Sequence, residues 1–290
     1  MTLIAGTMQK SLTPVQALLK LAAMLCILFF ALPVPGMGQT AEDLVRSGLA
    51  RSTAGDHAGA SEYYSRAIAT DDGFSEAYVL RARSEYLLSN FTGAITDLNN
   101  AIRIDPEFTE AYMLRGRARD ATGDHKGAID DYQVVIDMNP AFAEGYILRG
   151  RSRYAMAMYE EAIADLDRAT EIDPSYAEVY LLRGLARDAL GLHSDAIRDY
   201  SAAIELNSGY AEAWYKRGIS RFLNGDVSGA VDDFTSALEI DNRFAGAWYN
   251  RGLAFYMLDK RAEACADWHV AAGLGAPDAM VTLDELCGKQ

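Results

Sequence analysis

The chain has 290 residues, of which 50% are hydrophobic, and a net charge of −14 from 27 Lys and Arg against 41 Asp and Glu. So much apolar material excludes a disordered chain, because disordered segments are poor in apolar residues. The acidity argues against a nucleic-acid-binding protein, since binding to phosphates needs a basic face. We interpret it first as a solubility feature, with a preference for basic or Arg-rich partners as the alternative.

The first 38 residues differ from the rest and predict an export signal. Their only charges are Lys10 and Lys20, followed by the apolar run 21–32 and by the small residues Gly36 and Gly38. A basic start, a short apolar core and small residues before the cleavage point are typical of a secretory signal. A spanning helix needs about 20 apolar residues, so an uncleaved signal anchor is the alternative. Removing residues 1–38 takes away two positive charges and no negative one, which leaves −16 on the mature chain.

From Ala41 onward the sequence repeats every 34 residues without an insertion. Self-similarity at a fixed period indicates a repeat architecture. We count places from the first residue of each unit. Place twenty is Ala in all units, and place four is Leu44 in the first unit and Tyr or Trp in the others. The seven units are residues 41–74, 75–108, 109–142, 143–176, 177–210, 211–244 and 245–278.

The repeated pattern is aromatic, small, small, aromatic, small and Pro at places four, eight, twenty, twenty-four, twenty-seven and thirty-two. It resembles the tetratricopeptide repeat family. The resemblance implies an all-α, right-handed solenoid of seven helix-turn-helix hairpins. The physics agrees, because small residues at places eight and twenty let two helices approach closely, and stacked neighbours bury a continuous core.

The sequence after the seventh unit predicts a capping helix. Residues 277–287 have helical apolar spacing, so residues 279–290 form a cap and tail over the last hairpin. Cys265 and Cys287 are equidistant from residue 276, and equidistant residues face each other in an antiparallel helix pair. We predict a disulfide between them, worth about 3 kcal/mol; two buried free thiols are the alternative.

An arginine at place seven and an aspartate at place twenty-three recur in every unit except the first. Their joint absence from the first unit predicts ion pairs within a unit. Breaking a buried pair of this kind costs about 3–5 kcal/mol. We interpret the row as structural, with an arginine row for anionic partners as the alternative. The predicted pairs are Arg81 with Asp97, Arg115 with Asp131, Arg149 with Asp165, Arg183 with Asp199, Arg217 with Asp233, and Arg251 with Asp267.

Alternate units resemble each other more than neighbouring units do. Place ten alternates between Ala and Ser, and place seventeen is His57, His125 and His193 in the first three odd units. These histidines lie two units apart, too far for one ion with bonds of about 2 Å. We therefore predict no metal site.

The family resemblance also implies a partner-binding groove, because the first helix of each unit lines the concave surface in this family. Carrying its inward places over to this chain gives an apolar and aromatic strip that is basic in its early middle. Aromatic and Arg side chains are common anchors at interfaces. The predicted groove residues are Val79, Arg83, Tyr86, Met113, Arg117, Asp120, Ile147, Arg151, Tyr154, Leu181, Asp188, Tyr215 and Phe222.

We find no catalytic motif in the sequence and predict neither an enzyme nor a cofactor. The predicted function is a non-catalytic scaffold that binds a protein or peptide partner in the bacterial periplasm or cell envelope. An exported holdase or assembly chaperone, and a non-catalytic subunit of an enzyme complex, are the alternatives. We expect no nucleic acid, and contact with the membrane only through an uncleaved signal anchor. The sequence gives no oligomeric state.

Overall fold

The computed structural model describes residues 39–288 and is built from helices alone over that range. The predicted export signal lies outside the described residues. The first helices of the hairpins are α2 (Ala41–Thr53), α4 (Ser75–Leu87), α6 (Thr109–Ala121), α8 (Ala143–Ala155), α10 (Ala177–Ala189), α12 (Ala211–Leu223) and α14 (Ala245–Met257). The second helices are α3 (His57–Thr70), α5 (Phe91–Ile104), α7 (His125–Met138), α9 (Tyr159–Ile172), α11 (His193–Leu206), α13 (Val227–Ile240) and α15 (Arg261–Gly273). A shorter helix, α16 (Pro277–Leu286), follows.

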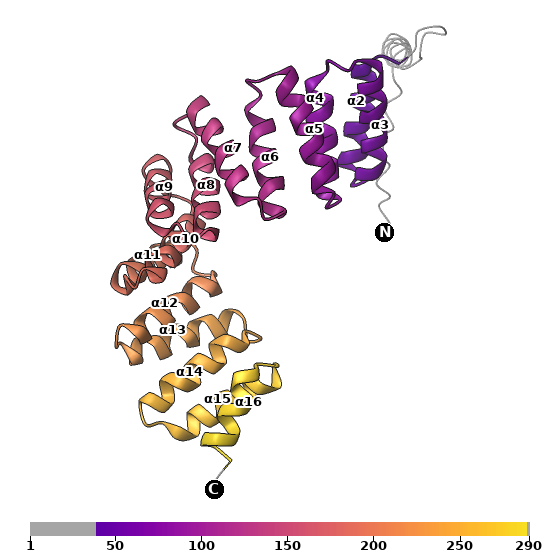
Figure 1. Cartoon of the computed structure of the whole chain (residues 1–290). Helices are drawn as coiled ribbons and strands as arrows, with labels where there is room; N and C mark the ends of the chain where they lie inside the picture. The colour runs from indigo at the N-terminus through magenta and orange to yellow at the C-terminus, as the bar shows by residue number, and fades with distance from the viewer. Residues whose placement is uncertain (1–38, 289–290) are drawn as a thin grey trace, which may run out of the picture.

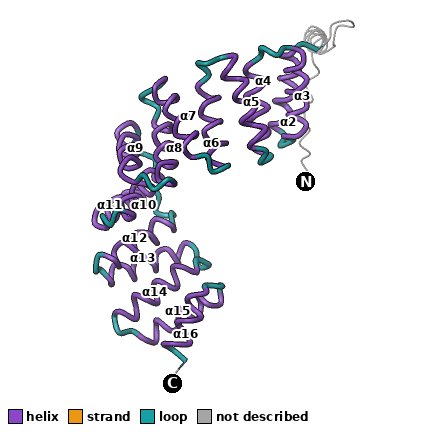
Figure 2. Tube along the Cα trace, viewed as in Figure 1, coloured by secondary structure: helices purple, strands orange, loops and turns teal. Residues whose placement is uncertain are grey.

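The helices form seven hairpins that stack in chain order, so the predicted α-solenoid is confirmed. Each helix packs against the helices before and after it in the chain. Figure 1 shows the stack as an open arc, with α9 and α11 on its outer side and α8 and α10 on its inner side. Figure 2 shows the same path as helices joined by short loops. None of the helices between residues 39 and 288 combines the length and apolar character needed to cross a membrane.

Each hairpin closes around small residues, as the sequence pattern indicated. The alanines at place twenty are fully buried in all hairpins. Place eight is Gly wherever place twenty-four is aromatic, and the reason is steric. A Cβ on Gly116 would lie 2.5 Å from the ring of Tyr132, whereas the same atom on Gly150 would lie 3.1 Å from the branched carbon of Leu166. The second hairpin, which has Leu98 at place twenty-four, therefore accommodates an alanine at place eight.

The C-terminal helix α16 packs against α15, the second helix of the seventh hairpin. A disulfide joins Cys265 in α15 to Cys287, with the Cα atoms 5.9 Å apart. Arg261 also donates to the backbone oxygen of Leu286. The end of α16 is thus held by a covalent bond and a hydrogen bond, while Ala279 is its only residue buried as a core residue.

Candidate functional site

The arginines at place seven lie between hairpins and are held on three sides. Each forms an ion pair with the aspartate at place twenty-three of its own hairpin, at 2.5 to 2.8 Å in all six cases. Each also stacks on the aromatic ring at place four of its own helix. The third contact crosses to the preceding hairpin, where Nη1 of the arginine donates to the side chain at place twenty-five. These acceptors are Ser65, Asn99, Gln133, Asp167, Ser201 and Thr235.

This arrangement gives the arginine row a structural role, because each guanidinium joins two hairpins. The aspartates are buried and the arginines largely so. The first hairpin has Ser47 and Tyr63 at these places. Within the described residues no second helix precedes this hairpin.

The sequence analysis missed a second arginine at the same aspartates. In hairpins three to six, an arginine at place eleven, one helical turn after place seven, also donates to the carboxylate of the place-twenty-three aspartate. The pairs are Arg119 with Asp131, Arg153 with Asp165, Arg187 with Asp199, and Arg221 with Asp233, at 2.7 to 3.0 Å. The signal was present in the sequence, since arginines four residues apart lie on one face of a helix.

Two contacts between successive hairpins are built on a shared carboxylate; we call these the polar joints. In the joint of hairpins three and four, Asp120 accepts from Tyr132 at 2.9 Å and from Ser152 at 2.8 Å. Its other oxygen lies 2.9 Å from Nδ1 of His125. The joint of hairpins five and six repeats the arrangement with Asp188, His193, Tyr200 and Ser220. Burial and the nearby carboxylate raise the pKa of both tyrosines.

The polar joints give Asp120 and Asp188 a structural role that the sequence analysis missed. Both were assigned to the partner-binding groove, and Asp120 does line the trough, but their carboxylates also bond to the tyrosine, serine and histidine of the joint. They also account for His125 and His193, whose rings contact these carboxylates, whereas His57 lies against Ser52. The described residues contain no cluster of side chains suited to a metal ion.

The intervening joints, of hairpins two and three, four and five, and six and seven, are apolar. Place twelve is aromatic here, and its ring meets the side chain at place seventeen. Tyr86 lies 5.3 Å from Phe91 and Tyr154 lies 5.5 Å from Tyr159 between ring centres. Tyr86 also packs against the core cluster that contains Ala118, the place-ten residue of the next hairpin. The alternation of places ten, twelve and seventeen in the sequence is therefore an alternation of polar and apolar joints.

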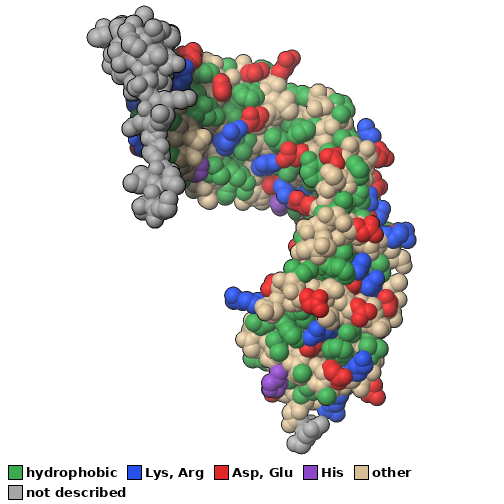
Figure 3. All heavy atoms as spheres, turned by 180° about the vertical axis from the view of Figure 1, so that it is seen from behind, with side chains coloured by type: hydrophobic (Ala, Val, Ile, Leu, Met, Phe, Trp, Pro, Cys, Tyr) green, Lys and Arg blue, Asp and Glu red, His purple; other side chains and the backbone are tan. Residues whose placement is uncertain are grey.

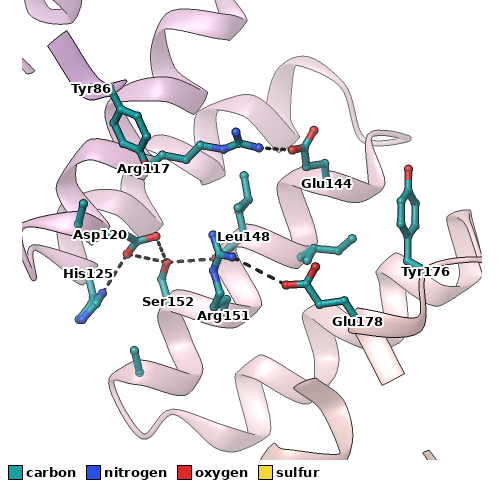
Figure 4. A pocket seen from close by; sticks show the side chains of 13 residues that line it. Tyr86, Arg117, Asp120, His125, Glu144, Leu148, Arg151, Ser152, Tyr176 and Glu178 are labelled. Carbon is teal, nitrogen blue, oxygen red and sulfur yellow. Dashed lines mark hydrogen bonds and ion pairs between the residues drawn. The ribbon is translucent and has the colours of Figure 1, made fainter. Parts of the chain in front are cut away.

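The inner side of hairpins two to five carries a depression of about 720 Å³, which we call the trough. Its apolar floor includes the exposed Ala121 and Ala155 together with the buried Ile147 and Leu148. Its sides carry pairs of Arg at place nine with Glu at place two of the next hairpin. Figure 4 shows two such pairs, Arg117 with Glu144 and Arg151 with Glu178, and Tyr86 and Tyr176 at opposite ends. The trough is lined by Tyr86, Arg117, Asp120, Ala121, His125, Glu144, Ile147, Leu148, Arg151, Ser152, Ala155, Tyr176 and Glu178.

The same Arg–Glu arrangement begins one hairpin earlier, where Arg83 pairs with Glu110. All six side chains of the three pairs are 38% to 58% exposed. Figure 3 shows basic and acidic side chains next to each other along the N-terminal arm of the arc, with hydrophobic side chains around them. The sequence analysis identified the arginines and missed that each has a glutamate partner.

The trough is narrower than the predicted groove, because several side chains at place five are buried between hairpins. Val79 and Leu181 are only 2% and 4% exposed and belong to the core between hairpins. Met113 packs partly buried against the cluster of Tyr132 and Leu148. Ile147 remains, at the trough floor.

Two predicted aromatic groove residues likewise pack against neighbouring rings. The ring of Tyr154 rests against Tyr159. That of Tyr215 lies 4.4 Å from Phe244, and its hydroxyl accepts from Asn250.

The C-terminal half of the inner side has a different character. Place nine is apolar in hairpins five to seven, and the last hairpin has Gly246 at place two. The series of Arg–Glu pairs therefore does not continue into this half. A small depression of about 210 Å³ between hairpins six and seven takes its place. It is lined by Ile219, Phe222, Leu223, Phe234, Asn250 and Leu253. Of the predicted groove residues, Phe222 therefore lines a separate apolar depression.

The comparisons with known proteins agree with this architecture. The family model described as "Tetratricopeptide repeat" matches residues 45–107, 81–141 and 184–243, and the one described as "TPR repeat" matches residues 150–191. The comparison with curated proteins finds no match.

Among solved structures, that of MamA is 27% identical with a TM-score of 0.54, and the match covers 57% of this chain and 96% of that chain. YrrB is 22% identical with a TM-score of 0.56, over 65% of this chain and 96% of that chain. A tetratricopeptide repeat protein from Parabacteroides merdae is 17% identical with a TM-score of 0.65, over 86% and 99%. Family models that cover more than half of the sequence, together with seven stacked hairpins, establish that this chain belongs to the tetratricopeptide repeat family.

Proposed function

We propose that this chain is a non-catalytic scaffold that binds an extended segment of a partner protein in the trough of hairpins two to five. Tetratricopeptide repeat proteins bind protein or peptide partners and are in general not catalysts. The observation that carries the proposal is the trough itself. It combines an apolar floor with charged side chains that are exposed and free to rearrange.

The shape of the trough favours a segment of chain over a small molecule. It is an open depression that crosses hairpins two to five, whereas small-molecule sites bury most of the ligand surface. An extended segment or a single helix makes contacts at intervals along such a surface. The fold can carry a site of this kind, as the solved structure of YrrB is described as having "an unusual peptide-binding site".

For the cellular location we propose the bacterial periplasm or cell envelope. The signal-like sequence of residues 1–38 supports it, and so does the disulfide, because disulfides persist in oxidising compartments. Fractionation followed by N-terminal sequencing tests this: a mature chain that begins at Gln39 in the periplasmic fraction is the expected result. A cytoplasmic chain that keeps residues 1–38 contradicts it.

A variant that fills the trough tests the binding function without assuming the charge of the partner. Ala155 lines the trough and is exposed, so Ala155→Trp places a large ring in it with little effect on the core. Ala164, exposed on α9, gives the matched control Ala164→Trp. We expect a partner captured stoichiometrically by the wild type and the control to be lost in Ala155→Trp.

The same capture distinguishes the other functional classes. Many unrelated proteins bound by all three forms indicate a holdase. A single partner bound equally by Ala155→Trp and the wild type rules out the trough as its binding site.

A further inference from the structure

The row of glutamates at place two is longer than the row of arginines that faces it. Six hairpins carry a glutamate at this place, whereas only Arg83, Arg117 and Arg151 occupy place nine as arginines. The three Arg–Glu pairs use the glutamates of hairpins three to five. The remaining three, Glu42, Glu76 and Glu212, make no ion pair among the described residues. The row therefore has unopposed negative charge on both sides of the trough.

The three pairs can exchange partners, in contrast to the buried place-seven row. Their side chains are exposed, and exposed ion pairs contribute only about 0–1 kcal/mol. A cation from a binding segment can therefore replace an arginine, or share its glutamate, at small cost. The strongly acidic chain attracts cationic segments over a longer range as well.

The trough floor and the ring of Tyr176 discriminate between basic and acidic side chains. Lys and Arg have long aliphatic stems that can lie on the exposed Ala121 and Ala155 while the charged head stays in water. Tyr176 is exposed and offers a ring face, which attracts cations and gives nothing comparable to carboxylates. Asp and Glu have stems too short to use the apolar floor in this way.

Resting on the function proposed above, we propose that the trough binds an extended protein segment carrying several Lys or Arg residues. Their aliphatic stems lie on the floor, and their charged heads contact Glu144 and Glu178 and the ring of Tyr176. Arg117 and Arg151 then turn away from the glutamates that they hold in the free protein. An acidic segment bound by the three arginines is the opposite solution, and the same experiment detects it.

The experiment measures fluorescence anisotropy with two labelled dodecapeptides, one alternating Lys and Ser around a central Leu, the other with Glu in place of Lys. We expect the full chain, in the form in which it is produced, to bind the Lys peptide at least ten-fold more tightly than the Glu peptide. The affinity should fall as the salt concentration rises, as expected for charge-dependent binding. Tighter binding of the Glu peptide overturns the proposal.

Two double variants test whether the glutamates or the arginines of the trough bind the Lys peptide. Glu144→Gln with Glu178→Gln should weaken binding of the Lys peptide about five-fold, since each exposed charge contact contributes up to about 1 kcal/mol. Arg117→Gln with Arg151→Gln should leave it unchanged or tighten it, because two competitors for the glutamates are gone. Weaker binding in the arginine variant overturns the proposal. Glu171→Gln with Glu205→Gln, exposed on second helices, is the control.

The outcome separates this proposal from the function on which it rests. A natural partner that Ala155→Trp excludes, and whose bound segment proves acidic by cross-linking, refutes the basic segment and leaves the trough as the binding site. A natural partner indifferent to Ala155→Trp refutes both.

Discussion

The polar and apolar joints solve the same packing problem with different side chains. Between hairpins five and six, Asp188 accepts hydrogen bonds from the hydroxyls of Tyr200 and Ser220 and contacts the ring of His193. At the equivalent places of hairpin four, which stacks on hairpin five, the rings of Tyr154 and Tyr159 pack on each other. The helices have the same lengths on both sides of either joint. The backbone repeat of the solenoid therefore does not require one set of interface residues, but each set must be complete.

The largest expected effect concerns a feature that both joint types share, the place-seven arginines. Arg149 crosses a polar joint to Gln133, and Arg183 crosses an apolar joint to Asp167. Removal of either leaves a buried aspartate with only its place-eleven arginine, Arg153 or Arg187, which costs up to about 3–5 kcal/mol. We expect Arg149→Ala and Arg183→Ala to lower the unfolding free energy in urea similarly. A large loss at only one of them shows that the two joints differ in this row as well.

The C-terminal joint, between α15 and α16, belongs to neither type and depends on a disulfide. Replacing Cys265 and Cys287 together by Ser should destabilise this end by about 3 kcal/mol. Because stability in a solenoid is local, we expect faster hydrogen exchange in α16 and unchanged exchange in α8. Mass spectrometry of non-reduced digests checks the bond itself. Both thiols found free in the exported protein contradict it.

A single substitution in a polar joint should be worse than its complete conversion. Asp188→Ala leaves buried hydroxyls without an acceptor, which costs about 1–3 kcal/mol. Copying the set of hairpins four and five, with Asp188→Tyr, His193→Tyr, Tyr200→Leu and Ser220→Ala, removes the carboxylate together with the side chains that bond to it. We expect this fourfold variant to unfold within about 1 kcal/mol of the wild type. If it is as unstable as Asp188→Ala, the two joints are not interchangeable.

The tyrosine of a polar joint should give a dependence on alkaline pH. Burial, with the added effect of Asp188, raises the pKa of Tyr200 above the value of about 10 that it has when unfolded. As pH rises past about 10, the unfolded state loses this proton first. Stability is therefore full below pH 10 and declines above it, by about 1 kcal/mol for this residue between pH 10 and 11.

Urea unfolding at both pH values tests this contribution. Tyr200→Phe should show a smaller decline than the wild type between pH 10 and 11, and Tyr176→Phe, at an exposed position, an unchanged one. Equal declines in all three proteins would falsify the account of the polar joint.

The smallest effect on stability is expected for a substitution at place nine, on the inner side of the arc. Leu185 occupies place nine opposite Glu212, where the preceding hairpins have Arg. Leu185 is partly buried against the cluster of Leu181 and Ala213, where the aliphatic stem of an arginine can replace it. Leu185→Arg should therefore add a fourth exposed pair and change stability by less than about 1 kcal/mol. It should weaken the binding of the Lys peptide, since it neutralises a free glutamate. Tighter binding contradicts the role of that glutamate.

The repeated features could be predicted from the sequence because each occurs many times. Seven copies of a 34-residue pattern indicate the hairpins, and the joint loss of Arg and Asp from the first unit indicates pairing within a hairpin. The trough was predicted less well. Whether a place-five side chain is open depends on how closely the next hairpin stacks, and the pattern of one unit does not contain that distance.

The polar joint shows a second reason why the sequence prediction fell short. Asp120 and Ser152 are 32 residues apart and bond across a hairpin boundary. Reading each place within its own unit assigned the aspartate to the groove. The signal that could have identified it was correlated alternation: Ser at place ten appears in the hairpin after each His at place seventeen.

The alternation of joints limits how such a chain can change length in evolution. Deletion of the fourth hairpin alone would bring Asp120 against Ala186, the alanine at place ten of the fifth, and the carboxylate would lose its serine. Deletion of hairpins four and five together would bring Asp120 against Ser220 and restore the joint. Recombination is therefore tolerated in steps of two hairpins. The inheritable module of this solenoid is a pair of hairpins, although each hairpin folds into the same shape.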